Sequence, residues 1–268
     1  MRTVPIKVFH LSSTMEDRDG MRDWLDHVGA TDYELPEGLS GCEQIIGHAA
    51  KRCYMSFEPG LNPNVNRVRK DWHKYFANIN HSGHGSVLEH GTHSYGIEGV
   101  SRVFTGELNR HRAGVAISEG SMRYIRFNDV PFWMPHSLLP QDGDSPDVVE
   151  KKNKSQLVFL KAFQQDESSY LELCEIWGIE DMKDFSQKKI LTSMFRRVIG
   201  MGVATGGVWT FNLRALRHII ALRTTPHAEE EISYVVSMIA KDLVSREPRI
   251  MCDFEETEAG WVPKYHKV

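Results

Sequence analysis

Residues 209–232 read WTFNLRALRHIIALRTTPHAEEEI, and this stretch carries the clearest folding signal in the chain. Its apolar residues recur at intervals of four, three and four positions, the spacing of one helix face: Trp209, Leu213, Leu216 and Ile220. Thr225-Pro226 predicts the start of a second helix, because proline suits the first helical turn and the acidic residues 229–231 favour it. Two amphipathic helices that pack on the core are therefore expected near the C-terminus.

Basic side chains flank the apolar stripe of the first of these helices. Arg214 and His218 lie four residues apart on one side, and Arg223 returns to the azimuth of Asn212 three turns later. A cation at the edge of a core needs an anionic partner. Two sources stay open: Glu229–Glu231 within the chain, or the phosphate oxygens of a ligand, which guanidinium groups bind bidentately.

A second basic cluster, RHRAGVAISEGSMRYIR at residues 110–126, precedes this region. Apolar residues from Val100 to Leu108 predict a helix with the RHR triplet at its C-terminal end, where cations complement the helix dipole. The triplet is followed by short hydrogen-bonding residues, a carboxylate and a glycine in residues 118–121, and then by Arg123. A solvated helix end is the structural alternative. The inventory favours a site for a phosphorylated small molecule over one for a nucleic-acid polymer.

The rest of the chain predicts a mixed fold of helices and strands. Val4, Ile6 and Val8 alternate as in a strand, and a polar stretch follows from Glu16 to Gly29. The other expected elements are helices at residues 42–57, 68–79 and 159–177, a strand at 92–97 and a proline-punctuated loop at 131–146. We interpret the 268 residues as one α+β domain with a sheet flanked by several long helices.

Composition bounds the class of protein. The net charge of −4, from 32 Lys+Arg and 36 Asp+Glu, provides no global positive field for nucleic acid or an anionic membrane. Lys7 and His10 interrupt what would be a signal-peptide core, and no apolar run is long enough for a membrane span, so a soluble cytoplasmic protein is expected. The four cysteines are scattered without any CxxC pair, which argues against a zinc ribbon or a disulfide framework.

Three motifs, in this order, resemble those of the flavin-dependent thymidylate synthases. HGS at 84–86 with EH at 89–90 resembles the family's GHxT/S…EH segment. RHR at 110–112, followed by Ser121 and RY at 123–124, resembles its RHR…S…RY signature, and residues 209–232 resemble its flavin and nucleotide region. The matching blocks span about residues 51–240, with the N-terminal strand and the C-terminal tail outside them. The resemblance implies that family's fold.

The resemblance also implies reductive methylation of dUMP to dTMP. 5,10-Methylenetetrahydrofolate would supply the carbon, NADPH would reduce a bound FAD, and the reduced flavin would complete the methyl group. Family positions that contact FAD correspond to Ser86, Arg110, His111, Arg112, Glu119, Asn212, Leu213, Arg214 and His218. Those that contact dUMP correspond to Glu107, Leu108, Asn109, Arg110, Glu119, Gly120, Ser121, Met122, Arg123, Arg196 and Arg223.

Arg223 is the expected catalytic residue, because it matches the family arginine thought to polarise uracil. A fixed cation would stabilise the negative charge that develops at N3 and O4 when carbon 5 attacks. Ser121 matches a serine once proposed as a nucleophile, but no clear base accompanies it, so we expect it to bind the nucleotide. His84 either helps to position flavin and folate or is structural.

The family further implies a homotetramer whose active sites collect residues from several subunits, in the cytoplasm of a bacterium or, for a viral protein, of its host. Its partners would be the small molecules dUMP, folate and NADPH, with no nucleic-acid polymer and no membrane.

Two other classes of function compete with this interpretation. Six histidines between residues 73 and 111 raise the possibility of a metal protein in which Glu89, His90 and His93 bind zinc, but no HExxH or CxxC motif supports it, so no metal is expected. The arginine clusters would also suit a non-catalytic nucleotide or nucleic-acid binder, which predicts salt-sensitive binding and no flavin. A thymidylate synthase with a cysteine nucleophile is disfavoured because no cysteine is followed by histidine.

Overall fold

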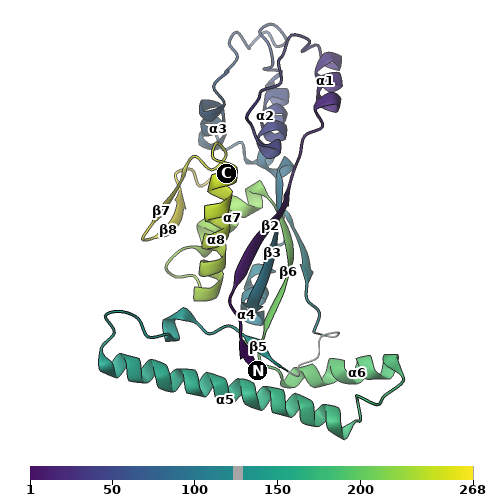
Figure 1. Cartoon of the computed structure of the whole chain (residues 1–268). Coiled ribbons are helices and arrows are strands. Elements are labelled where there is room, and N and C mark those ends of the chain that lie inside the picture. Colours follow the sequence, from purple (N-terminus) through teal and green to yellow (C-terminus); the bar gives the residue numbers. More distant parts are fainter. Residues whose placement is uncertain (123–128, 268) are drawn as a thin grey trace. The chain divides into compact units, whose positions relative to one another are not determined.

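The computed structural model describes residues 1–122 and 129–267, which form two compact units interleaved along the chain (Figure 1). The first unit comprises Met1–Val8, Gly96–Arg110 and Ile117–Val208, and the second comprises Phe9–Tyr95, His111–Ala116 and Trp209–Val268. Helices and sheet strands are both present, which confirms the expected α+β class. The single domain expected over residues 1–268 stays a prediction.

Four strands form the main sheet, in the order β2 (Lys7–Ser13), β3 (Thr92–Ser101), β6 (Ala204–Asn212) and β4 (Val115–Glu119). The strand predicted at residues 92–97 is confirmed as part of β3. Hydrogen bonds beside β4 and β6 show that these strands are antiparallel, because Gly120 N donates to Gly206 O and Asn212 N donates to Gly114 O.

The first unit is built around a helix of 31 residues, α5 (Pro146–Ile176), and α6 (Phe185–Phe195) (Figure 1). Ser145 caps α5 and Pro146 occupies its first turn, so the helix predicted at residues 159–177 is confirmed as part of it. Phe132 stacks on Phe163 with ring centroids 4.3 Å apart. The other elements are short: β1 (Arg2–Thr3), α4 (Arg102–Leu108), β5 (Pro131–Phe132), η2 (His136–Leu138) and η3 (Arg196–Val198).

The second unit contains helices of 6 to 17 residues and the C-terminal hairpin. The apolar stripes of α7 (Leu213–Arg223) and α8 (Glu230–Arg246) are buried, as their spacing predicts. Its elements are α1 (Arg18–His27), α2 (Gly41–Tyr54), α3 (Trp72–His81), η1 (Gly85–His90), α7 (Leu213–Arg223), α8 (Glu230–Arg246), β7 (Phe254–Thr257) and β8 (Gly260–Pro263). No helix in the described part of the chain is both long and apolar enough to cross a lipid bilayer.

Two helix starts near the C-terminus differ from the prediction. Trp209 belongs to β6, and α7 begins only after Asn212, whose side chain accepts a hydrogen bond from Ala215 N. The last helix begins at Glu230 and not at Thr225-Pro226, because the Glu229 carboxylate caps the backbone N–H groups of its first turn. Local spacing alone therefore placed both helix starts too early.

Three other predicted boundaries are also wrong. The helix expected from Val100 begins only at Arg102, because Ser101 caps its first turn. It ends at Leu108, so the RHR triplet lies beyond its C-terminal end. The N-terminal strand begins at Lys7, where Val4 and Ile6 were expected to belong to it. The polar stretch after it contains α1, where Asp17 caps the helix and Met21 and Leu25 bury one face.

Candidate functional site

In the first unit, residues near α4, β4 and η3 line an open pocket of about 560 Å³. It brings together five of the expected site residues: Glu119, Gly120, Ser121, Met122 and Arg196. Arg102 and Arg197 also line it. Residues from a strand end and from the turn after α6 are thus brought to one cavity, although they are separated by more than 70 positions in the sequence.

Arg102 fixes the acidic side of this pocket. One of its guanidinium nitrogens donates to the Glu119 carboxylate and the other donates to Gly120 O at 2.7 Å. Asn109 Nδ2 donates to the second Glu119 oxygen at 3.1 Å. The sequence analysis missed Arg102. A signal was available, because a cation in the first turn of a helix opposes the helix dipole and needs another reason to be there.

The electrostatics of the pocket favour an anion. Among the described lining residues there are three guanidinium groups and a single carboxylate, Glu119, which is already paired with Arg102. The buried Nε of Arg102 has no hydrogen-bond partner among the described residues. A planar fork of N–H donors that matches phosphate oxygens is the arrangement expected of a phosphate site.

The remaining expected nucleotide contacts in this unit surround the end of α4. Glu107 and Asn109 are partly exposed, and Arg110 lies exposed in the turn that follows. The Leu108 side chain is 1% exposed, so this residue can offer a ligand only its backbone. Arg123 lies outside the described residues.

In the second unit, the loop after the RHR triplet packs on the start of α7. Gly114 O accepts a hydrogen bond from Asn212 N at 2.8 Å, and Gly91 O accepts one from Leu213 N at 2.8 Å. Gly114 has a φ of +71°, and a Cβ there would lie 2.4 Å from Asn212 Nδ2. Glycine is therefore required for this close approach. The Leu213 side chain is buried, so only its backbone can reach a ligand.

Arg223 and two histidines form a cluster in this unit. Arg223 Nε donates to His111 Nε2 at 3.0 Å, and the rings of His111 and His218 are 6.2 Å apart. Burial, followed by the charges of Arg223 and His218, lowers the pKa of His111, which favours the neutral imidazole that accepts the hydrogen bond from Arg223. Three expected site residues thus contact one another across 112 positions of sequence.

The other expected flavin positions of the second unit lie on exposed elements. Ser86 is in η1, Arg112 is in the turn after α4, and Arg214 Nη1 donates to Glu89 Oε1 at 2.6 Å. The η1 N-cap, His84, stacks on Tyr54 and shares a hydrogen bond of 3.1 Å with its hydroxyl.

Two arginines on α7 have intrachain partners outside the stretch that the sequence suggested. Arg214 pairs with Glu89, and Arg217 forms a two-pronged ion pair with Asp253. Of residues 229–231, the intrachain partners considered for this helix, Glu229 caps α8. No local pattern marks Asp253 as a partner, because it is brought to α7 by the chain's return after α8.

Comparisons with known proteins place the chain among relatives of one family. Residues 34–249 match the family model described as thymidylate synthase complementing protein. A flavin-dependent thymidylate synthase of Mycolicibacterium vanbaalenii is 31% identical over 237 residues, which cover 85% of this chain and 88% of that protein. A second, from Mycolicibacterium gilvum, is 31% identical over 230 residues, with 84% and 85% covered.

Two solved structures share the fold. A UMP/dUMP methylase, PolB, from Streptomyces cacaoi bound with 5-Br dUMP has a TM-score of 0.64 and 18% identity, covering 93% of this chain and 95% of that one. Thymidylate Synthase X from Helicobacter pylori with FAD and dUMP has a TM-score of 0.55 and 18% identity, covering 91% and 96%. The extent of the family match and the identity to the curated relatives show that this chain belongs to the flavin-dependent thymidylate synthases, a family of enzymes.

Proposed function

We propose that this enzyme methylates dUMP to dTMP, with 5,10-methylenetetrahydrofolate as the carbon donor, FAD as the flavin and NADPH as its reductant. The observation that carries the proposal is the arginine-lined pocket beside Ser121. The Helicobacter pylori structure contains FAD and dUMP, and the Streptomyces cacaoi structure contains 5-Br dUMP, so relatives with this fold bind such ligands.

The pocket of the first unit is proposed to hold the nucleotide. Arg196 provides a guanidinium group for the 5′-phosphate, and Ser121 provides a hydroxyl. Arg102 keeps Glu119 in place by its hydrogen bonds to that carboxylate and to Gly120 O. The pocket size suits a ligand of nucleotide dimensions.

The residues proposed to hold FAD fit that group in the chemistry of their donors. Arg112 and Arg214 are exposed cations that suit a pyrophosphate, and Ser86 adds an exposed hydroxyl at η1. Asn212 and His218 follow Arg214 on or beside α7 as further polar groups. When bound, the flavin supplies the reducing equivalent that turns a one-carbon unit into a methyl group.

Arg223 is proposed to stabilise the negative charge that forms on the uracil ring. Its Nε–H donates to neutral His111, which orients the guanidinium plane. A fixed cation at N3 and O4 lowers the cost of making carbon 5 nucleophilic, and its orientation before the reaction avoids reorganisation during it. His111 thus acts as a positioning residue for Arg223.

The active site is further proposed to be shared between the subunits of a cytoplasmic homotetramer. The test is co-expression of Arg110→Ala and Arg223→Ala chains, because mixed tetramers would rebuild some complete sites. Activity above that of either single variant supports shared sites, and mixed assemblies without such activity contradict them.

The first experiment on the proposed function is a visible absorbance spectrum of the purified protein before and after addition of dUMP. Flavin bands that shift with dUMP, followed by dTMP formation with 5,10-methylenetetrahydrofolate and NADPH, are the expected result. The same assay with UMP tests the ribonucleotide named for the Streptomyces cacaoi relative. A protein that binds no FAD and does not respond to dUMP would overturn the proposal.

A matched pair of variants ties the activity to the pocket. Arg196→Ala removes a pocket guanidinium and is expected to raise the KM for dUMP, whereas Arg52→Ala removes an exposed arginine of α2 and should leave the KM unchanged. Equal effects of the two variants would show that the pocket does not bind the nucleotide.

A further inference from the structure

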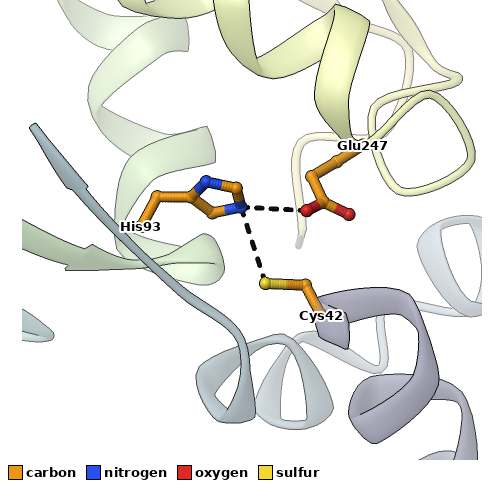
Figure 2. Close-up of side chains that lie close together, drawn as sticks. All are labelled: Cys42, His93 and Glu247. Carbon is orange, nitrogen blue, oxygen red and sulfur yellow. Dashed lines mark hydrogen bonds and ion pairs between the residues drawn. The ribbon is translucent and has the colours of Figure 1, made fainter. Parts of the chain in front are cut away.

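Three side chains with metal-ligating atoms meet in the core of the second unit (Figure 2). Cys42 lies in the first turn of α2, His93 lies in β3, and Glu247 is the cap residue that follows α8. Figure 2 shows the thiol and the carboxylate both directed at one nitrogen of the imidazole ring. All three residues are at most 1% exposed, so the cluster is closed to bulk water.

The distances among these atoms are close to those between ligands of one tetrahedral ion. Cys42 Sγ lies 3.5 Å from His93 Nε2, which lies 3.0 Å from Glu247 Oε1, and all three atoms are within 4.8 Å of one another. Zinc bonds of ~2.3 Å to sulfur and ~2.0–2.1 Å to nitrogen or oxygen place tetrahedral ligands roughly 3.3–3.6 Å apart. A small shift of the side chains would therefore admit the ion.

The surrounding groups are arranged as those around metal ligands usually are. His10 Nε2 lies 3.0 Å from His93 Nδ1, so a proton held between these nitrogens leaves the Nε2 lone pair directed at the cluster. Ser40 Oγ donates to Glu247 Oε2 at 2.5 Å, which leaves Oε1 for the ion. The Thr92 carbonyl oxygen, 3.7 Å from Cys42 Sγ, or a water molecule would fill the fourth position.

The charge of the cluster also favours a cation. Glu247 is a buried carboxylate, and none of the described lysines and arginines forms an ion pair with it. Buried charges in proteins are paired or bind metals, because desolvation of an isolated ion is costly. A divalent ion would balance the carboxylate and the thiolate together, and its binding would release the thiol proton of Cys42 to solvent.

A Cys–His–Glu catalytic triad is not supported by this geometry. In a triad the acid binds the imidazole nitrogen opposite the nucleophile, whereas here Cys42 and Glu247 both approach Nε2. Burial also excludes a substrate from the sulfur.

We propose that Cys42, His93 and Glu247 form a structural binding site for a zinc-like divalent cation. The mixed sulfur, nitrogen and oxygen donors suit Zn²⁺, and Co²⁺ takes the same geometry. The proposal departs from the expectation that the chain holds no metal. It concerns different residues from the proposed nucleotide and flavin contacts, so it stands or falls independently of the proposed function.

The test is equilibrium dialysis of the full chain against Zn²⁺, with the retained metal measured by atomic spectrometry. One tightly bound ion per chain is expected for the wild type and for Cys53→Ser, an exposed cysteine on the same helix, whereas Cys42→Ser should lose it. His10→Ala should weaken binding by about 10–100-fold, because it removes only the group that orients His93. Far-UV circular dichroism of the metal-free variants checks that each is folded.

A second measurement needs no Cys42 variant. Addition of Co²⁺ to the Cys53→Ser protein should produce a thiolate-to-cobalt absorption band, recorded as a difference spectrum so that flavin absorption cancels. Either of two results would overturn the proposal: no retained Zn²⁺ and no cobalt–thiolate band, or equal retention by a folded Cys42→Ser protein. The first would identify the cluster as a hydrogen-bonded polar core, and the second would locate the ion elsewhere.

Discussion

Replacing Asp253 by asparagine should destabilise the second unit more than any exposed charge change, because it leaves the buried cation of Arg217 unpaired. The two guanidinium nitrogens of Arg217 donate to the two carboxylate oxygens at 2.8 and 2.9 Å, and the side chains are 1% and 2% exposed. Asn80 Nδ2 donates to Asp253 as well, at 3.0 Å. The substitution keeps the shape of Asp253 and removes its charge.

The expected magnitude follows from burial. Removing one partner of a buried ion pair costs about 3–5 kcal/mol, because the remaining charge stays desolvated. For a chain of this size each kcal/mol lowers the melting temperature by roughly 2–4 °C, so a decrease of about 6–20 °C is expected. The matched control is Glu256→Gln, whose pair with Lys241 has side chains 51% and 61% exposed and should contribute less than about 1 kcal/mol.

The assay is urea unfolding followed by far-UV circular dichroism for the wild type, Asp253→Asn, Glu256→Gln and the double variant Arg217→Met/Asp253→Leu. The double variant removes both charges and should recover much of the lost stability. If Asp253→Asn costs no more than Glu256→Gln, the pair does not stabilise α7. If the double variant is less stable than Asp253→Asn, the unpaired charge is not the cause of the loss.

Three further variants test individual features of the second unit. Burial lowers the pKa of the Lys51 ammonium to about 8. The wild type should therefore gain about 2–3 kcal/mol in unfolding free energy as the pH rises from about 8 to 10.5. Lys51→Met should lack that gain, which urea unfolding at several pH values would measure. Because folding lowers the pKa of His111, its imidazole in the unfolded chain binds a proton at a higher pH than in the folded chain. The wild type should therefore lose more stability than His111→Gln as the pH falls below 6.5, and parallel losses would contradict the burial of a neutral imidazole. Gly114→Ala should cost about 1–3 kcal/mol, because its Cβ would meet Asn212 and its φ is positive. Gly106→Ala is the control, since its Cβ has space within α4 and should be neutral or stabilising; equal melting temperatures of these two variants would refute the reasoning.

Sequence reasoning succeeded where the signal was local or where motifs recurred in order. Alternation predicted the strand at residues 92–97, and the stripe from Leu213 to Ile220 predicted the buried face of α7. The motifs at 84–90, 110–124 and 209–232 identify the family from the sequence alone, and the family match confirms it. Each of these features depends on neighbouring residues or on residues at fixed intervals along the chain.

Sequence reasoning failed where a capping side chain or a neighbouring strand decides where a helix or strand begins. Trp209 has the spacing of a helix residue, yet its backbone belongs to strand β6 of the sheet. The acidic cap Glu229 starts α8 after the proline that suggested an earlier start. Periodicity reports which face is buried, whereas the hydrogen bonds that end an element come from particular side chains and from distant strands.

The sequence by itself determined the family, the α+β class, the buried helix faces and the inventory of arginines that suit a phosphorylated ligand. Only the tertiary structure decided which groups meet: Arg102 with Glu119, Arg217 with Asp253, and Cys42 with His93 and Glu247. The last cluster joins positions separated by 51 and 154 residues. Helical and strand periods act over neighbouring residues, but the partner of a buried charge or thiol depends on how the chain folds back on itself, which no local pattern encodes.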